Sequence, residues 1–183
     1  PMQELLNEAK RLASEGVKEL VLVAQETTLY GKDLTGEKQL PLLLHELCKI
    51  EGIEWIRLLY CYPEEITDEL IKVIKTEEKV CNYIDMPIQH SENRILQRMG
   101  RRTSREDLVA VIKKLRKEIP DITIRTTLIT GFPGESQEDH EGLMNFVEEC
   151  QFDRLGVFTY SPEEDTLAAT FEDQIDEEVK EER

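Results

Sequence analysis

Apolar and polar positions change period repeatedly along this chain, and each change marks the boundary of a predicted element. Apolar side chains recur at helical spacing over residues 2–15, 40–50, 64–76, 92–99, 105–118 and 137–150. Shorter apolar runs predict strands over residues 19–24, 55–60, 83–88, 122–130 and 153–160. Strands and helices therefore alternate after the first helix, and crossovers of this length predict a parallel sheet.

Polar signals refine several of these boundaries. Thr103-x-x-Glu106 predicts a capping box before one helix, and Ser136-Gln-Glu-Asp139 predicts another. Residues 30–39 contain two glycines and are expected to form a polar loop. His45 and His140 fall within predicted helices, where we expect them at the surface.

The stretch 122–135 reads as a strand followed by a Gly-Phe-Pro-Gly turn and the start of a helix. Ile124 and Leu128 should face one side of the strand, and Arg125 and Thr127 the other. An unpaired buried charge is costly, so Arg125 needs an anionic partner. The strand therefore suggests one wall of a site for a polar ligand, with glycines that let backbone approach closely.

These features predict an α/β fold in the form of a partial, TIM-like (β/α) barrel that is open and has about five parallel strands. Polar residues on the inward strand faces (Arg57, Asp85, Arg125 and Thr127) fit an open barrel better than a closed, packed one. The sequence contains neither a Gly-x-Gly-x-x-Gly motif nor a Walker motif, so it does not indicate a nucleotide-binding, doubly wound sheet. Because the chain opens on a helix, we expect the first strand to be missing.

Charge is distributed unevenly. The net charge of −16 argues against direct nucleic-acid binding, because phosphate contacts need a basic field. It favours a basic protein partner, although solubility alone also explains it. Residues 163–183 are acidic and poor in apolar side chains. We therefore expect a core over 1–162 and a tail over 163–183 that frays or forms a linker helix.

Cysteine usage and hydropathy suggest the compartment. No run of about twenty apolar residues occurs, so no membrane span is expected. Cys48, Cys61, Cys81 and Cys150 are too far apart for a zinc or iron–sulfur motif. Scattered cysteines without an export signal fit a reducing cytoplasm, and we expect each as a small core residue.

Polar residues at the carboxyl ends of the predicted strands mark the candidate site, because parallel barrels place their sites there. His90 fits either a general acid–base or a hydrogen-bonded loop histidine. The arginines within 98–102 fit an anion site, a contact with a partner or an exposed loop. The strand-end residues are Gln25, Glu26, Thr27, Thr28, Tyr60, Gln89, His90, Thr130, Gly131, Tyr160 and Ser161.

Several separated motifs resemble, in order, the radical SAM domain of the methylthiotransferases, which use S-adenosylmethionine (SAM) and iron–sulfur clusters to add a methylthio group. The resemblance covers nearly all of residues 1–170. Its motifs are Leu22-Val-Ala-Gln-Glu-Thr-Thr-Leu-Tyr-Gly31, Asp85-Met-Pro-Ile-Gln-His90, Ile95-Leu-Gln-Arg-Met-Gly-Arg-Arg102, Thr127-Leu-Ile-Thr-Gly-Phe-Pro-Gly-Glu135 and the segment 152–164.

Two branches of this family differ in substrate. One modifies an adenosine of transfer RNA, and the other modifies an aspartate of a basic small-subunit ribosomal protein. Ala24-Gln-Glu-Thr-Thr28 and Phe152-Asp-Arg-Leu-Gly-Val-Phe-Thr-Tyr160 resemble the protein-modifying branch, and the acidic charge agrees with it. A further alternative is a non-catalytic α/β module that docks a basic protein.

The resemblance implies SAM and two 4Fe-4S clusters as cofactors of the full-length enzyme. The family's three-cysteine motif and its N- and C-terminal domains are absent, so this fragment is expected to hold no cluster and to be inactive, with no catalytic residue assigned. The resemblance assigns the SAM pocket to Gln25, Glu26, Thr27, Gln89, Arg125, Thr127, Gly131 and Gly134. Within that pocket Arg125 is the natural partner for the SAM carboxylate, because a guanidinium can pair with a carboxylate bidentately. Candidates that face the substrate are His90, Arg101, Arg102 and Tyr160.

Overall fold

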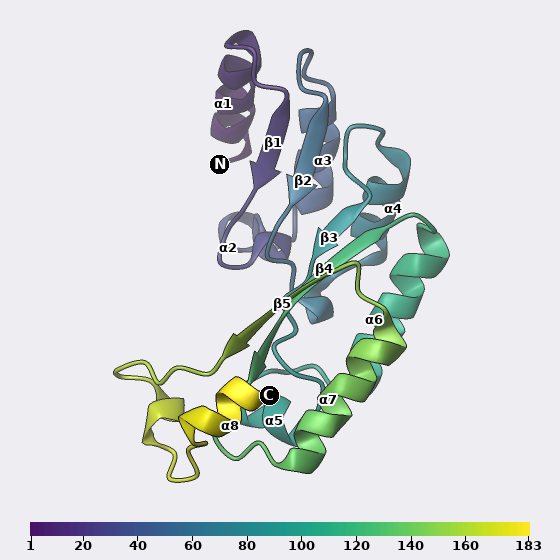
Figure 1. Ribbon diagram of the computed structural model, residues 1–183. Helices are drawn as coiled ribbons and strands as arrows, with labels where there is room; N and C mark the ends of the chain where they lie inside the picture. The colour runs from purple at the N-terminus through teal and green to yellow at the C-terminus, as the bar shows by residue number, and fades with distance from the viewer.

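Five parallel strands in sequential order form the centre of the protein, whose computed structural model describes residues 1–183 (Figure 1). β1 pairs with β2, and β3, β4 and β5 form a second ladder. The Ile56 N–H donates to the Lys79 carbonyl (2.7 Å) and the Cys61 N–H to the Asp85 carbonyl (2.8 Å), which joins the two ladders. The strands are β1 (Glu19–Leu22), β2 (Trp55–Leu58), β3 (Tyr83–Asp85), β4 (Thr123–Thr130) and β5 (Arg154–Thr159).

The strands fan out along a curve that does not close, because β1 and β5 stand at opposite ends without pairing. All three ladder pairings are parallel. The predicted open, parallel α/β arrangement is therefore confirmed.

Helices cover the outer side of the curve and leave the inner side open (Figure 1). No helix is both long and apolar enough to cross a bilayer. The longer helices are α1 (Met2–Ser14), α3 (Leu40–Cys48), α4 (Asp68–Thr76), α6 (Arg105–Glu118) and α7 (Gln137–Cys150). The short ones are α2 (Lys32–Thr35), α5 (Asn93–Arg98) and α8 (Glu177–Glu182), with 3₁₀ turns at Thr27–Leu29, Pro63–Glu65 and Leu167–Thr170.

The core lies between the helices and the outer face of the strands. Along β4, burial alternates with a period of two, as expected for a strand with one face on the core. Ile124 and Leu128 are buried in the main cluster, whereas Arg125 and Thr127 face the open side and are half-buried. The predicted facing of this strand is confirmed.

Local structure differs from the predictions at four places. The capping box of α6 uses Ser104 and Asp107, one position after the predicted pair, while the box of α7 is as predicted. The predicted loop 30–39 includes the short helix α2. The helix predicted from residue 64 begins at Asp68, where Thr67 supplies the cap. His140 is buried rather than exposed, because α7 turns it toward the end of β4.

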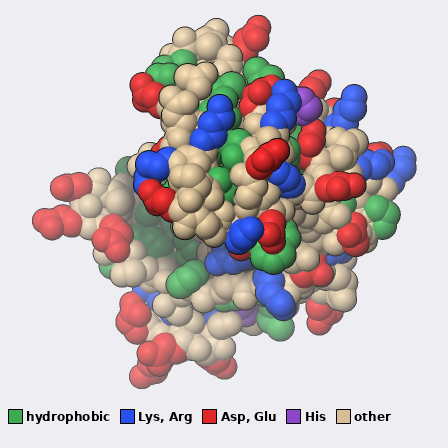
Figure 2. Space-filling model, turned by 90° about the horizontal axis from the view of Figure 1, so that it is seen from above, with side chains coloured by type: hydrophobic (Ala, Val, Ile, Leu, Met, Phe, Trp, Pro, Cys, Tyr) green, Lys and Arg blue, Asp and Glu red, His purple; other side chains and the backbone are tan.

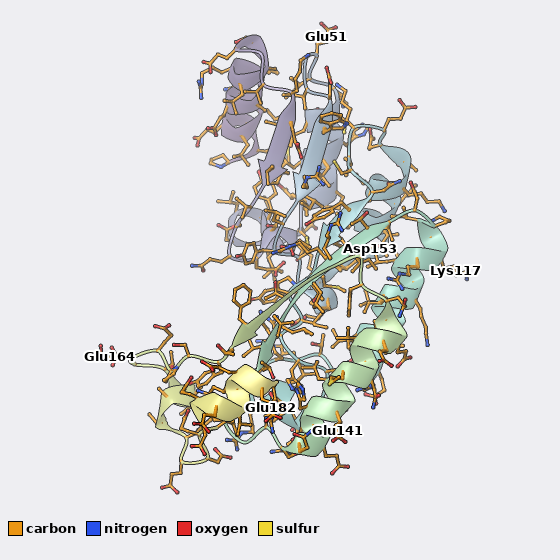
Figure 3. The ribbon with its side chains drawn as sticks, in the orientation of Figure 1. Glu51, Lys117, Glu141, Asp153, Glu164 and Glu182 are labelled. Atoms are coloured by element: carbon orange, nitrogen blue, oxygen red, sulfur yellow. The ribbon has the colours of Figure 1, made fainter.

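The acidic tail is folded against the body of the protein. α8 lies beside the end of β4 and α5 (Figure 1). Lys180 is 2% exposed, and the Arg183 side chain is 8% exposed. Most other charged tail residues remain exposed, and Glu164 points away from the strands at the tip of a loop (Figure 3). The tail therefore combines a packed cationic side with an acidic outer side.

Candidate functional site

A cavity of about 750 Å³ opens where the carboxyl ends of the strands converge. Each strand contributes a residue at or just beyond its end, and α5 and the tail complete the wall. This is the position that parallel barrels use for their sites. The lining residues are Gln25, Tyr60, Tyr62, Pro87, Gln89, Arg98, Met99, Gly100, Arg101, Ile129, Phe132, Tyr160, Leu167 and Ala168.

Four residues of the predicted site line this cavity: Gln25, Gln89, Arg101 and Tyr160. Gln89 has a φ of 71° and so adopts a conformation uncommon for a residue with a side chain. Its N–H donates to the Thr127 carbonyl (2.9 Å), and its own carbonyl accepts from Ile129 (2.7 Å). These two backbone hydrogen bonds to β4 hold Gln89 in this conformation at the cavity wall.

Glu26 and Thr27 lie outside this wall and tie the ends of β1 and β2 together. The Thr27 hydroxyl is buried and donates to the Leu59 carbonyl (2.5 Å). The Glu26 carboxylate accepts the N–H groups of Thr28 (2.9 Å) and Tyr62 (3.0 Å). Burial raises the pKa of Glu26 above its ordinary value, against the opposing effect of these hydrogen bonds. Both residues thus position the loops that carry the cavity-lining Gln25 and Tyr62.

Arg125 finds its anionic partner inside the protein. Its Nη1 lies 2.6 Å from Oδ1 of Asp85, whose side chain is 1% exposed. The other oxygen of Asp85 accepts the N–H of Tyr60 (3.1 Å). The hydrogen bond with Asp85 raises the pKa of Arg125 further. A bound ligand is therefore not needed to balance this charge, and Arg125 with its neighbour Thr127 lies on the inner face without lining the cavity.

The Gly131–Gly134 turn faces the tail. Both glycines have positive φ values, 71° and 81°, which glycine adopts without strain. A Cβ at Gly131 would collide with the Lys180 side chain, and one at Gly134 would lie 2.5 Å from Asp173 Oδ2. The tail residues Lys180 and Asp173 therefore occupy the space that the missing Cβ atoms leave beside this turn.

Glu135 is the centre of a buried polar cluster behind the cavity. Its carboxylate accepts the Gly131 N–H (2.9 Å) and pairs with Nη1 of Arg183 (2.7 Å). His90 Nε2 lies 3.4 Å from the same carboxylate. Burial acts to raise the pKa of Glu135, but His90, Arg183 and the Gly131 N–H outweigh it and lower the pKa.

His90 belongs to this cluster rather than to the cavity. It is completely buried, and its Nδ1 accepts the Glu92 N–H (3.0 Å). His140 lies at the other side of Glu135, at 3.8 Å, and burial lowers its pKa. The structure therefore places His90 behind the wall, where it does not line the cavity. Its contact with Glu92 is the kind expected for a hydrogen-bonded loop histidine.

Arg101 and Arg102, adjacent in sequence, occupy different environments. Arg101 lines the cavity, while Arg102 is exposed and does not line it. The Cζ of Arg101 lies 4.6 Å from the centre of the Tyr62 ring. Arg101 also donates to the carbonyl of Pro87. Only one of the two arginines is thus positioned to meet a ligand in the cavity.

Sequence reasoning missed some residues that define the site. The sequence marks Tyr60 as a strand end and predicts no role for it or for Tyr62. Both line the cavity, and both follow β2 in the pattern Tyr-x-Tyr-Pro. Tyr60 has a φ of 56°, which is rare for a bulky residue. Glu135 was also missed; an acidic residue directly after a glycine turn and before a helix cap was the available signal.

The cysteines do not form a metal site. No group of three His, Cys, Asp or Glu side chains is placed to hold a metal ion. All four cysteines are free thiols. Burial raises the pKa of Cys48 and of Cys150 to about 11, and it raises the pKa of Cys61 as well. A cluster needs several thiolates at one place, so these residues do not fit an iron–sulfur cluster.

Comparison with known proteins identifies relatives over the whole chain. The sequence profile of the radical SAM superfamily matches residues 1–147. The chain is 65% identical over 180 residues to the "Ribosomal protein uS12 methylthiotransferase RimO" of Lachnoclostridium phytofermentans, covering 98% of this chain. It is 59% identical over 182 residues to the protein of the same name from Clostridium perfringens, covering 100% of this chain. The chain spans 41% of the length of each of these curated relatives.

Solved structures share the fold at low sequence identity. The methyltransferase TsrM from Kitasatospora setae superposes with a TM-score of 0.68 at 16% identity, covering 87% of this chain and 31% of that one. Streptococcus suis SuiB gives a TM-score of 0.64 at 16% identity, covering 96% of this chain and 37% of that one. At this identity the likeness concerns the arrangement of strands and helices alone.

Proposed function

Because this chain belongs to the radical SAM superfamily, we propose that it is the SAM-binding part of a methylthiotransferase that modifies a small-subunit ribosomal protein. The observation that carries the proposal is the 65% identity, over 98% of the chain, to a relative named as a ribosomal protein uS12 methylthiotransferase. The matched region covers nearly the whole chain and so includes the elements that surround the cavity. The same similarity favours the protein-modifying branch over the branch that modifies transfer RNA.

The cavity at the strand ends is the proposed SAM pocket. Enzymes of this superfamily use SAM with an iron–sulfur cluster, which supplies the electron that cleaves SAM. Tyr60, Tyr62 and Phe132 give the cavity aromatic walls that suit a flat, partly apolar ligand. Gln25 and Gln89 add amide groups that can hydrogen-bond to its polar edges. Tyr160 adds a further aromatic side chain to the wall.

The remaining predicted residues take supporting roles in this proposal. Glu26 and Thr27 hold the loops beneath the pocket. Arg125 ties β4 to Asp85 at the end of β3, and Thr127 lies near it on the inner face. Gly131 and Gly134 let the tail pack closely on the turn. Residues 1–162 act as the core in this reading, and 163–183 as the segment that leads from it.

We further propose that two 4Fe-4S clusters are held by cysteines outside this chain. The four cysteines present are widely separated, and the curated relatives are more than twice as long. A cytoplasmic location belongs to the same proposal and is supported by the four free thiols. The 183 residues alone are then inactive.

The partner in this proposal is a basic protein, and the modified residue is an aspartate. A net charge of −16 favours a basic polypeptide by electrostatic steering and opposes RNA. Acidic side chains are spread over the surface in Figure 2, and the outer side of the tail contributes several of them.

The test uses the full-length protein after anaerobic reconstitution of its clusters. We expect SAM cleavage and, by mass spectrometry, a methylthio group on the ribosomal protein. Transfer RNA from the same reaction serves as the competing substrate, and modification of adenosine there would redirect the proposal to the other branch. Binding of the ribosomal protein with neither SAM cleavage nor SAM dependence would instead support the non-catalytic docking module.

A further inference from the structure

The charges that line the cavity are of one sign only. Arg98 and Arg101 are its only charged lining residues, and no aspartate or glutamate contributes to the wall. This composition is unusual for a chain with 39 acidic and 23 basic residues. A ligand that fills the cavity therefore meets positive charge, and an anionic group is favoured there.

Arg98 is already neutralised by the tail. Its Nη2 lies 2.6 Å from Asp173 Oδ1, and its Nε donates to the Pro133 carbonyl (3.2 Å). Its guanidinium also stacks on Phe171, at 4.5 Å from the ring centre. These contacts hold α5 to the tail and leave Arg98 little capacity to bind a further anion.

Arg101 is not neutralised. No carboxylate pairs with it, and its contacts are the Tyr62 ring and the carbonyl of Pro87. A guanidinium has five N–H donors, so most of its hydrogen-bonding capacity remains free. Arg57 and Arg125, which the sequence pattern places on inward strand faces, are paired with Glu19 and Asp85. Arg101 is therefore the one unbalanced cation in the wall.

The backbone fixes the position of Arg101. α5 ends with Gly100 in the left-handed region (φ 73°), and the Arg101 N–H donates to the Leu96 carbonyl (2.8 Å). This is the hydrogen bond of a Schellman motif, which sets the direction in which the chain leaves the helix. Stacking on Tyr62 then holds the guanidinium plane. Such preorganisation reduces the entropy that is lost when a ligand binds.

We propose that Arg101 is the carboxylate-recognition residue of this cavity, which it enters as a planar, bidentate donor. The inference rests on the proposed function, where two ligands carry a carboxylate: the methionine part of SAM and the aspartate side chain of the protein substrate. Both present the same chemistry to a guanidinium. Arg101 acts in binding and orientation, and it transfers no proton.

The test compares Arg101→Gln, Arg101→Lys and the exposed control Arg102→Gln in the full-length, reconstituted enzyme. Equilibrium dialysis gives the Kd of SAM and of decarboxylated SAM. Surface plasmon resonance gives the Kd of the ribosomal protein and of its variant in which the target aspartate is changed to asparagine. Loss of a charge-assisted bidentate contact corresponds to about 10- to 100-fold weaker binding.

If Arg101 binds the cofactor, R101Q weakens SAM by that factor and leaves decarboxylated SAM unchanged. If it binds the substrate, R101Q weakens the ribosomal protein and leaves the asparagine variant unchanged. R102Q should leave all four affinities within about twofold. Equal weakening of ligands with and without the carboxylate, or no weakening of any, would overturn the proposal.

Arg101→Lys keeps the charge but loses the planar fork. If R101Q lowers the unfolding midpoint, the lysine variant is used for the comparison instead. Its expected effect is a loss of affinity of roughly 3- to 10-fold for the ligand with the carboxylate and none for the ligand without it. If the wild-type enzyme fails to modify the ribosomal protein, the proposed function fails. The SAM comparison still tests Arg101, since it requires no methylthio transfer.

Discussion

Replacing Glu135 by glutamine should destabilise the protein more than any conservative change on its surface. The Glu135 carboxylate is completely buried and pairs with Arg183, whose side chain is 8% exposed. The same carboxylate accepts the Gly131 N–H and lies beside His90. Removing one partner of a buried ion pair costs about 3–5 kcal/mol, because the other charge is left without compensation.

Glutamine has the same shape as glutamate and keeps one acceptor oxygen. We therefore expect the free energy of unfolding to fall by about 3 kcal/mol, the lower end of this range. Urea unfolding followed by circular dichroism at about pH 7 measures this difference directly. Glu141→Gln is the matched control. Glu141 lies on the exposed side of α7 and points outward (Figure 3), so its replacement should change the free energy of unfolding by about 0.5 kcal/mol or less.

The pH dependence gives a second check on the same reasoning. The pKa of Glu135 lies below its ordinary value of 4.5, so its stabilising effect is complete above that value. The effect is lost as the pH falls through the lowered pKa. The difference between wild type and Glu135→Gln should therefore shrink on acidification. A difference below about 1 kcal/mol at neutral pH, or one that does not change with acid, would refute this account of the cluster.

Three further predictions concern other parts of the fold. Asp85→Asn should lower the free energy of unfolding by about 1–2 kcal/mol, because Arg125 loses its charged partner, and thermal unfolding measures this change. An unchanged midpoint would show that solvent replaces Asp85 as the partner of Arg125. Ser136→Ala removes the side-chain cap of α7 and should cost about 1 kcal/mol by urea titration, whereas a cost near zero would contradict the capping box. In native protein at about pH 8, Cys61 and Cys150 should react slowly with thiol reagents, since burial disfavours their thiolates. All thiols should react at one rate in urea, and fast native labelling of Cys61 would argue against its burial.

The order and facing of the strands could be predicted from the sequence. Each element has its own hydrophobic period, and the right-handed crossover rule leaves few ways to arrange alternating strands and helices. Ile124 and Leu128 on one face of β4 and Arg125 on the other follow from the period of two. The convergence of Gln25, Gln89 and Tyr160 on one cavity follows from the common position of parallel strand ends.

The contacts of individual polar side chains could not be predicted, because they depend on residues far apart in sequence. Arg125 is satisfied by Asp85, forty positions away, rather than by a ligand. Glu135 pairs with Arg183, forty-eight positions away, in a tail that reads as an acidic linker. The average composition of the tail is acidic, but its two cations Lys180 and Arg183 are the charged residues that pack against the body.

The sequence by itself therefore determined the layers, the direction of the strands and the end at which the cavity opens, since these depend on local period and chain connectivity. Only the tertiary structure decided which charges remain free. A charge is paired only if folding brings a carboxylate within a few ångströms of it. Arg125 and Arg98 each have such a carboxylate, and Arg101 has none.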